Sequence, residues 1–200
     1  MGTTERRLRQ KDEVRSSILA TAWQIVTEEG WQSLSIRKIA DAIEYSAPVI
    51  YDHFQNKESI LIEFARDGFR LLTKKMEQAK NKYTQPAEQL RAMADAYWNF
   101  AFRNKEYYQV MFGLGISCSE AEKCIPEKMN FRELMLTPIA EILDKNKRTD
   151  VSPCLKGHTF WSVIHGLISI KMMRTSDLCD DLNKMVLDDA ISGFIKNLGK

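Results

Sequence analysis

The chain has 200 residues, 44% of them hydrophobic, which is enough for the buried core of one or two domains. Its formal net charge is +2, so a strongly basic field over the whole molecule is excluded. The N-terminus is too polar for a signal peptide, and no apolar run is long enough to span a membrane. We therefore expect a cytoplasmic protein without membrane contact.

Positive charge is concentrated at the start of the chain. Residues 1–11 contain one acid, Glu5, and four basic residues, Arg6, Arg7, Arg9 and Lys11. Such a basic arm can reach a phosphate or the minor groove of DNA. A charge run is equally typical of a solvated, disordered terminus, so both interpretations stay open. A helix is predicted over about residues 11–29, with its C-terminal stop at Gly30.

The next segment predicts two short amphipathic helices joined by a tight turn. The first covers about residues 35–43, the turn residues 44–46 and the second helix residues 47–54. Ser46 stands at the N-cap of the second helix, and Pro48 falls in its first turn, where a missing N–H costs little. The inward-facing positions are Ile36, Ile39, Ala40, Ile43, Ile50 and Phe54. This is the pattern of a helix-turn-helix, whose second helix enters the DNA major groove.

Residues 15–65 resemble the N-terminal DNA-binding domain of the TetR family of bacterial transcriptional repressors. The residues that carry the resemblance are Ala22, Gly30, Ser35-Ile36-Arg37-Lys38-Ile39-Ala40, Tyr45-Ser46, Ile50-Tyr51-Asp52-His53-Phe54, Asn56-Lys57-Glu58 and Leu61. The resemblance implies that Ser35, Tyr51 and Lys57 bind phosphates and that residues 47–53 meet base edges. The expected DNA-binding set is Ser35, Arg37, Ser46, Ala47, Pro48, Val49, Tyr51, His53 and Lys57.

Two positions depart from the family pattern. Glu44 stands in the turn where the family usually has glycine. A non-glycine residue at positive φ costs roughly 1 kcal/mol, so we expect the turn to be shaped differently. Asp52 brings a carboxylate near DNA, where it either accepts from a cytosine amino group or stays solvated.

The remainder of the chain predicts helices throughout, so the expected fold class is all-α. Asn56 is the expected N-cap of a long helix over about residues 57–82, which contains no Gly/Pro-rich linker. We place the domain boundary inside this helix. Residues 1–70 then form the helix-turn-helix domain, with residues 1–11 as its basic arm, and residues 71–200 form a helical ligand-binding and dimerisation domain.

Aromatic and methionine side chains in the C-terminal part suggest a pocket for a small apolar or aromatic ligand. The candidate ligand-binding residues are Tyr97, Trp98, Phe102, Met111, Phe112, Met135, Trp161 and His165. Such residues at helical spacing are equally typical of a core. For His165, a core histidine with satisfied hydrogen bonds is favoured over a ligand contact.

The last two predicted helices, over residues 153–173 and 180–198, carry apolar residues on more than one side. Pairing with the same helices of a second copy gives a four-helix interface with two-fold symmetry. We therefore expect a homodimer. Trp161, His165 and Gly166 also resemble the Trp-His-Gly signature of one class of TetR-family C-terminal domains.

The remaining chemistry of the sequence is sparse. The cysteines are Cys118, Cys124, Cys154 and Cys179, with no CxxC spacing, and inert thiols are favoured over redox sensing by Cys118 and Cys124. His158 and His165 lack tight metal-ligand spacing, so neither a metal nor a cofactor is expected. No nucleophile–base pair, glycine-rich phosphate loop or paired carboxylates within an apolar run is apparent, so no enzyme activity is expected.

Two functions remain. The favoured one is a ligand-responsive, homodimeric DNA-binding regulator, specifically a repressor that binds double-stranded DNA at a palindromic operator. The alternative is an all-helical enzyme or adaptor that carries an incidental helix-turn-helix-like pair. Salt-dependent binding to duplex DNA separates the two, because phosphate neutralisation imposes a steep salt dependence.

Overall fold

The structure is a computed structural model that describes residues 3–113, 125–173 and 180–200. The described residues form no β-strand, so the all-α prediction is confirmed. None of the described helices has both the length and the apolar character that crossing a membrane requires. The helices are α1 (Thr3–Glu29), the short 3-10 helix η1 (Trp31–Ser33), α2 (Ile36–Ala42), α3 (Ala47–Tyr51), α4 (Lys57–Lys80), α5 (Pro86–Arg103), α6 (Lys105–Phe112), α8 (Glu127–Lys145), α9 (Pro153–Met172) and α10 (Asp180–Leu198).

The predicted cysteine pair cannot be placed in this fold. Cys118 and Cys124, together with Cys179, lie outside the described residues. Cys154 is a half-buried free thiol near the start of α9.

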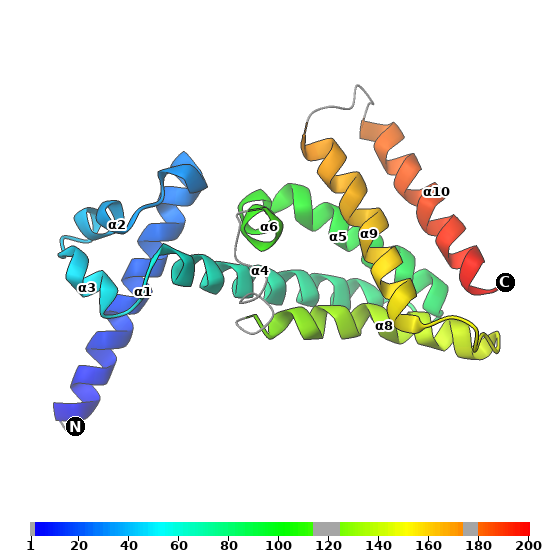
Figure 1. Ribbon diagram of the computed structural model, residues 1–200, viewed down its shortest axis with the longest axis horizontal. Coiled ribbons are helices and arrows are strands. Elements are labelled where there is room, and N and C mark those ends of the chain that lie inside the picture. Colours follow the sequence, from blue (N-terminus) through cyan, green and yellow to red (C-terminus); the bar gives the residue numbers. More distant parts are fainter. Residues whose placement is uncertain (1–2, 114–124, 174–179) are drawn as a thin grey trace.

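The first three helices form a small domain at one end of the molecule (Figure 1). With the first turns of α4 they enclose an apolar core in which Ile18, Ile39 and Ile50 are fully buried. The side chain of Ser35 caps α2 by accepting the N–H of Lys38 at 3.2 Å. The predicted helix-turn-helix is therefore present as α2 and α3.

Two helix ends differ from the sequence prediction. Helix α1 begins at Thr3 rather than near residue 11, because residues 5–15 contain strong helix formers and neither glycine nor proline. The basic residues of the expected arm are therefore exposed on a helix that projects beyond the domain (Figure 1). Helix α3 ends at Tyr51 rather than Phe54, although the N–H of Phe54 still donates to the carbonyl oxygen of Ile50 at 2.9 Å.

The turn between α2 and α3 is left-handed despite its glutamate. Glu44 has a φ of 59°, and its N–H donates to the carbonyl oxygen of Asp41 at 3.3 Å. The N–H of Tyr45 donates to the carbonyl oxygen of Ala40 at 3.0 Å. This bond pair is a Schellman motif, which ends a helix with one residue in the left-handed region. The expected change of turn shape is therefore wrong, and the fold holds Glu44 there at a cost of roughly 1 kcal/mol.

Helix α4 belongs to both parts of the molecule. Its first turns bury Ile60 and Phe64 against the N-terminal domain. Its second half buries Phe69, Leu72 and Met76 among α5, α6 and α8. Helices α9 and α10 lie on the outside of this group, far from α2 and α3 (Figure 1).

Replacing Glu44 with glycine should stabilise the protein, because glycine enters the left-handed region without a steric penalty. We expect a gain of about 0.5–1 kcal/mol in the free energy of unfolding, measured by urea denaturation. Glu44→Ala removes the same charge but keeps the Cβ, so it should show no such gain. Equal stability of the two variants would mean that Glu44 carries no backbone strain.

Candidate functional site

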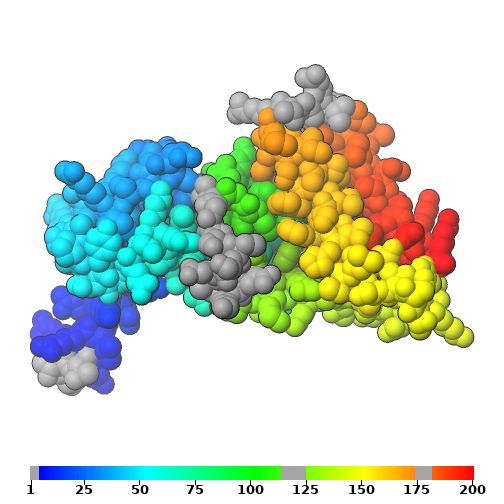
Figure 2. Space-filling model, in the orientation of Figure 1, coloured from blue at the N-terminus to red at the C-terminus, as the bar shows by residue number. Residues whose placement is uncertain are grey.

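The α2–turn–α3 region and the start of α4 (residues 35–57, the reading head) present a largely open surface (Figure 2). Arg37 is 91% exposed and only loosely paired with Asp41, at 4.0 Å. Tyr51 is 54% exposed, so its hydroxyl is accessible beside the end of α3. Ser35, Ser46 and Pro48 are exposed as well. These side chains are therefore free to contact a partner.

Other predicted DNA contacts are only half-buried surface groups. They are Ala47, Val49, His53 and Lys57. The Nζ atom of Lys57 lies 3.4 Å from the carbonyl oxygen of Trp31, a long hydrogen bond that leaves most of its donor capacity unused. The Nδ1 atom of His53 is buried without a hydrogen-bond partner in the described part of the chain. Lys57 is thus better placed than His53 to meet an external acceptor.

An aromatic cluster joins the N-terminal domain to α6. The ring of Trp23 stacks on Tyr107, with centroids 4.2 Å apart, and also packs on Phe64 at 5.2 Å. The indole N–H of Trp31 donates to the backbone carbonyl of Glu106 at 3.1 Å. This contact could not be predicted from the sequence, because it joins residues far apart in the chain. Together, Trp23 and Trp31 hold α1 and η1 against α6.

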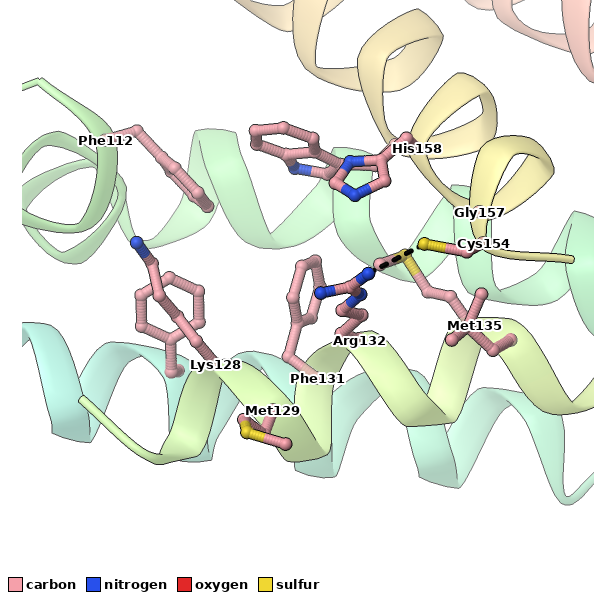
Figure 3. A pocket seen from close by; sticks show the side chains of 12 residues that line it. Phe112, Lys128, Met129, Phe131, Arg132, Met135, Cys154, Gly157 and His158 are labelled. Atoms are coloured by element: carbon pink, nitrogen blue, oxygen red, sulfur yellow. Dashed lines mark hydrogen bonds between the residues drawn. The ribbon is translucent and has the colours of Figure 1, made fainter. Parts of the chain in front are cut away.

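A cavity of about 380 Å³ opens between α4, α6, α8 and α9 (Figure 3). Three predicted ligand-binding residues line it: Phe112, Met135 and Trp161. The other lining residues are Phe69, Lys128, Met129, Phe131, Arg132, Leu136, Cys154, Gly157 and His158. Figure 3 shows Phe112 on one side, the α8 side chains below and His158 above. The cavity is therefore a mainly apolar pocket with cationic groups among its walls.

The other five predicted ligand-binding residues do not line this cavity. Trp98 and Phe102 pack together at 4.9 Å, and the Nζ atom of Lys171 lies over both rings. Met111 is buried against Gly68 of α4. A Cβ added to Gly68 would lie only 2.6 Å from the Met111 sulfur, so α6 and α4 approach each other closely here. Tyr97 is buried in the core. Helical spacing alone could not separate these residues from the pocket residues.

His165 is part of a polar cluster beside the pocket. Its Nδ1 atom lies 2.5 Å from the hydroxyl of Tyr108 and 3.4 Å from that of Tyr97. The indole N–H of Trp161 donates to the Tyr97 hydroxyl at 3.2 Å. An imidazole nitrogen has one lone pair, so Nδ1 accepts from the nearer tyrosine, Tyr108. Burial lowers the pKa of His165 below its ordinary value of 6.5, which keeps the ring neutral in this role.

The start of α8 is tied to α4 by a shared carboxylate. Glu127 accepts from Arg70 at 2.6 Å and from Arg66 at 3.3 Å. Its side chain is only 12% exposed. Desolvation raises the pKa of Glu127, but its hydrogen bonds and the two arginine charges lower it by more, so the net shift is downward. Arg66 also contacts Glu63 at 3.5 Å, and Glu63 pairs with Arg15 of α1 at 3.0 Å.

Replacing Tyr108 with phenylalanine removes the donor to His165 and leaves a half-buried acceptor with only the longer Tyr97 contact. We expect a loss of about 1–2 kcal/mol in the free energy of unfolding. The measurement should be made above pH 6.5, where His165 is neutral in both the folded and unfolded states. The control Tyr83→Phe, at a tyrosine that is 46% exposed, should change stability little. Equal effects of the two substitutions would contradict the assigned hydrogen bond.

Two family models match the chain. The model of bacterial regulatory proteins of the tetR family matches residues 18–64, which include the reading head. The model of the tetracyclin repressor-like C-terminal domain matches residues 90–190, which include the pocket helices α6, α8 and α9 and parts of α5 and α10.

Similar proteins agree with these models. The HTH-type transcriptional activator FasR of Mycolicibacterium smegmatis is 26% identical over 102 residues, 51% of this chain and 47% of that protein. The tetracycline repressor protein class G of Vibrio anguillarum is 34% identical over 47 residues, 24% of this chain and 22% of that protein. The chain thus spans about half or less of the length of these curated relatives.

The whole fold is also shared with solved structures. A protein of unknown function from Rhodococcus sp. RHA1 superposes with a TM-score of 0.78 at 21% identity, covering 93% of this chain and 95% of that one. At this identity the likeness concerns the fold alone. With family models matched to both its N-terminal and C-terminal parts over more than half of its length, the chain belongs to the tetR family of bacterial regulatory proteins.

Proposed function

We propose that this protein is a homodimeric, ligand-responsive transcription regulator that binds a palindromic operator in double-stranded DNA. The observation that carries the proposal is the double role of α4, which packs under the reading head and supplies Phe69 to the pocket wall. The relatives are transcription regulators, which argues against the enzyme alternative. Binding to DNA also supports a cytoplasmic location.

Repression is the output we propose. A dimer bound to its operator excludes other proteins from that DNA by occupancy alone, so repression needs no surface beyond the two reading heads. The curated relatives include both an activator, FasR, and a tetracycline repressor. A reporter gene placed behind the selected operator distinguishes the outputs, because loss of the protein raises a repressed reporter and lowers an activated one.

We assign the DNA contacts to the exposed side of the reading head. Ser35, Tyr51 and Lys57 are the proposed phosphate contacts, and α3 is the proposed base-reading helix. The remaining members of the proposed DNA-binding set are Arg37, Ser46, Ala47, Pro48, Val49 and His53. The exposure of Arg37 and Tyr51 supports this assignment.

Loss of the Lys57 charge should weaken binding to all DNA sequences alike. For Lys57→Ala we expect the slope of log affinity against log salt to fall by about one unit per half-site. Tyr51→Phe should also weaken binding to all DNA sequences alike. The measurement is fluorescence anisotropy of duplexes selected from a random pool, at several salt concentrations. Lys75→Ala, an exposed lysine in the second half of α4, is the charge-matched control. An unchanged salt slope in Lys57→Ala would remove Lys57 from the proposed contacts.

We place the dimer interface on the outer sides of α9 and α10. Exposed apolar residues gather there: Leu155, Ile170, Met173, Leu182, Met185 and Val186. A Cβ built on Gly166 or Gly193 would meet no atom of the protomer within 4 Å. These glycines therefore leave room for a second pair of helices at close approach. Phe194 is unsuitable as an interface probe, because it is 8% exposed and packs on Phe160 at 5.4 Å.

An arginine at Gly193 should prevent dimerisation without harming the protomer. The site is open, and replacing a helical glycine raises helix propensity by up to about 1 kcal/mol. We expect Gly193→Arg to sediment as a folded monomer at micromolar concentration. Its operator affinity should fall by about tenfold or more, because one half-site buries too little surface for tight binding. Gln78→Arg, on the exposed side of α4, is the matched control. A dimeric Gly193→Arg variant would overturn this interface.

We propose that the pocket controls DNA binding through α8 and α4. Helix α8 supplies much of the pocket wall, and its first residue, Glu127, bridges Arg66 and Arg70 on α4. A ligand changes DNA affinity only if it binds better to one arrangement of the reading heads than to another. A shift of α8 around a ligand would pull on α4, on which each reading head is built.

Weakening the Glu127 bridge should therefore weaken the response to ligand. The ligand is one found in a thermal-shift screen. Operator affinity is measured without and with this ligand, and the ratio of the two affinities should lie closer to one in Glu127→Gln than in the wild type. Typical ratios for coupled sites are roughly 5–150-fold. Glu133→Gln removes an exposed charge from the same helix and should keep the wild-type ratio. A wild-type ratio in Glu127→Gln would exclude the bridge as the link.

Two finer assignments complete the proposal. We place Trp161, His165 and Gly166 in the Trp-His-Gly class of C-terminal domains. The stacking of Trp161 on His165, with centroids 5.2 Å apart, gives this motif a structural role beside the pocket. We also place the boundary between the domains within α4 at residue 70.

A further inference from the structure

The described residues that line the pocket include two cations, Lys128 and Arg132. The basic side chains among the described lining residues are Lys128, Arg132 and His158, and no carboxylate is among the described lining residues. Lys128 and Arg132 lie one helical turn apart on α8, on the same face. The described lining side chains therefore carry a net positive charge.

The two cations have weak partners in the described part of the protein. Arg132 donates to the sulfur of Cys154 at 2.7 Å, a weak acceptor (Figure 3). The Nζ atom of Lys128 lies 5.9 Å from the centre of the Phe69 ring. Neither makes an ion pair with a described residue, whereas Arg66 and Arg70 on the neighbouring α4 share Glu127. Lys128 and Arg132 are thus available to an anion from outside.

The pocket also holds like charges in unfavourable positions. Two cations at positions i and i+4 of a helix repel each other. Lys128 stands in the first turn of α8, where the positive end of the helix dipole disfavours a cation. An anion bound between Lys128 and Arg132 relieves both effects.

The walls behind the cations are apolar and aromatic. Phe69, Phe112, Phe131 and Trp161 surround the space, and Met135 adds an adaptable side chain. A volume of about 380 Å³ suits the apolar body of a small organic molecule. The pocket therefore combines a hydrophobic interior with a cationic group of side chains on one wall.

We propose that the pocket binds an amphipathic organic anion, with a carboxylate- or sulfonate-type head held by Lys128 and Arg132 and an apolar body between the aromatic rings. This proposal adds an anionic head to the small apolar or aromatic ligand expected from the sequence, and its regulatory meaning rests on the proposed function. The head binds next to Glu127, the residue that bridges to α4. The proposed anion site and the ion pairs that hold α4 therefore both lie at the start of α8.

A pair of fluorescent probes tests the charge requirement. Anilinonaphthalene sulfonate and phenylnaphthylamine share one aromatic body and differ by the sulfonate. We expect the sulfonate probe to bind the wild-type protein more tightly than the neutral probe. In Lys128→Met/Arg132→Met its affinity should fall by about tenfold or more, because a charge-assisted contact is lost. The affinity of the neutral probe should stay within about twofold.

A charge-matched control variant shows whether the effect depends on the position of the two charges in the pocket. Lys75→Met/Lys145→Met removes two exposed charges away from the pocket and should bind both probes as the wild type does. Equal binding of both probes, or an unchanged sulfonate affinity in the pocket variant, would overturn the anion assignment while leaving an apolar pocket. Binding of neither probe would overturn it too. If the sulfonate probe behaves as expected but leaves operator affinity unchanged, the anion site stands and ligand-responsive regulation fails.

Discussion

The structure depends on the continuity of α4. A single helix, Lys57–Lys80, begins beside α2 and α3 and ends among the C-terminal helices. Both apolar cores are completed by its side chains, so neither part of the molecule can rotate without moving or bending this helix. An unbroken helix carries displacement along its axis because its backbone hydrogen bonds form one connected ladder. This makes α4 the natural mechanical link between the pocket and the reading head.

Two further contacts surround this link and differ in their chemistry. The contact of Trp23 and Trp31 with α6 combines ring stacking with one hydrogen bond to a backbone carbonyl and involves no charged side chain. The ion-pair series from Arg15 through Glu63 and Arg66 to Glu127 connects α1, α4 and α8 over three successive contacts. The side chains of these four residues are only 12–36% exposed, so solvent screens their ion pairs less than it screens pairs on an open surface.

The local parts of this protein could be predicted from sequence. The helix-turn-helix rests on spacings within one or two turns, and the predicted N-cap at Asn56 is present with a reciprocal bond to Ser59. The conformation of Glu44 could not be predicted from the local sequence. Its φ is positive because the packing of α2 and α3 outweighs the strain at this residue. Helix α1 could have been extended to the start of the chain from propensity alone. The basic residues of this segment instead led to the prediction of a basic arm outside the helix.

The pocket could be predicted only in part, for a different reason. Phe112, Met135 and Trp161 line it, whereas Tyr97, Trp98 and Met111 have the same residue types and spacing but are buried elsewhere. The difference is decided by contacts between distant segments, which periodicity does not contain. Lys128 and Arg132 were missed because two cations on a helix surface usually indicate a solvated face. Their position in a cavity becomes visible only when α9 is placed over α8.

We propose that the pocket and the spacing of the two reading heads are coupled in the proposed dimer. Pulsed electron–electron resonance can measure that spacing with a nitroxide on p-acetylphenylalanine at position 37, where the native Arg37 side chain is 91% exposed. This label avoids the thiol of Cys154, which lines the pocket. The distance distribution between the two labels should shift when anilinonaphthalene sulfonate saturates the pocket, and shift less in Glu127→Gln. An identical distribution with and without the bound probe would contradict the account.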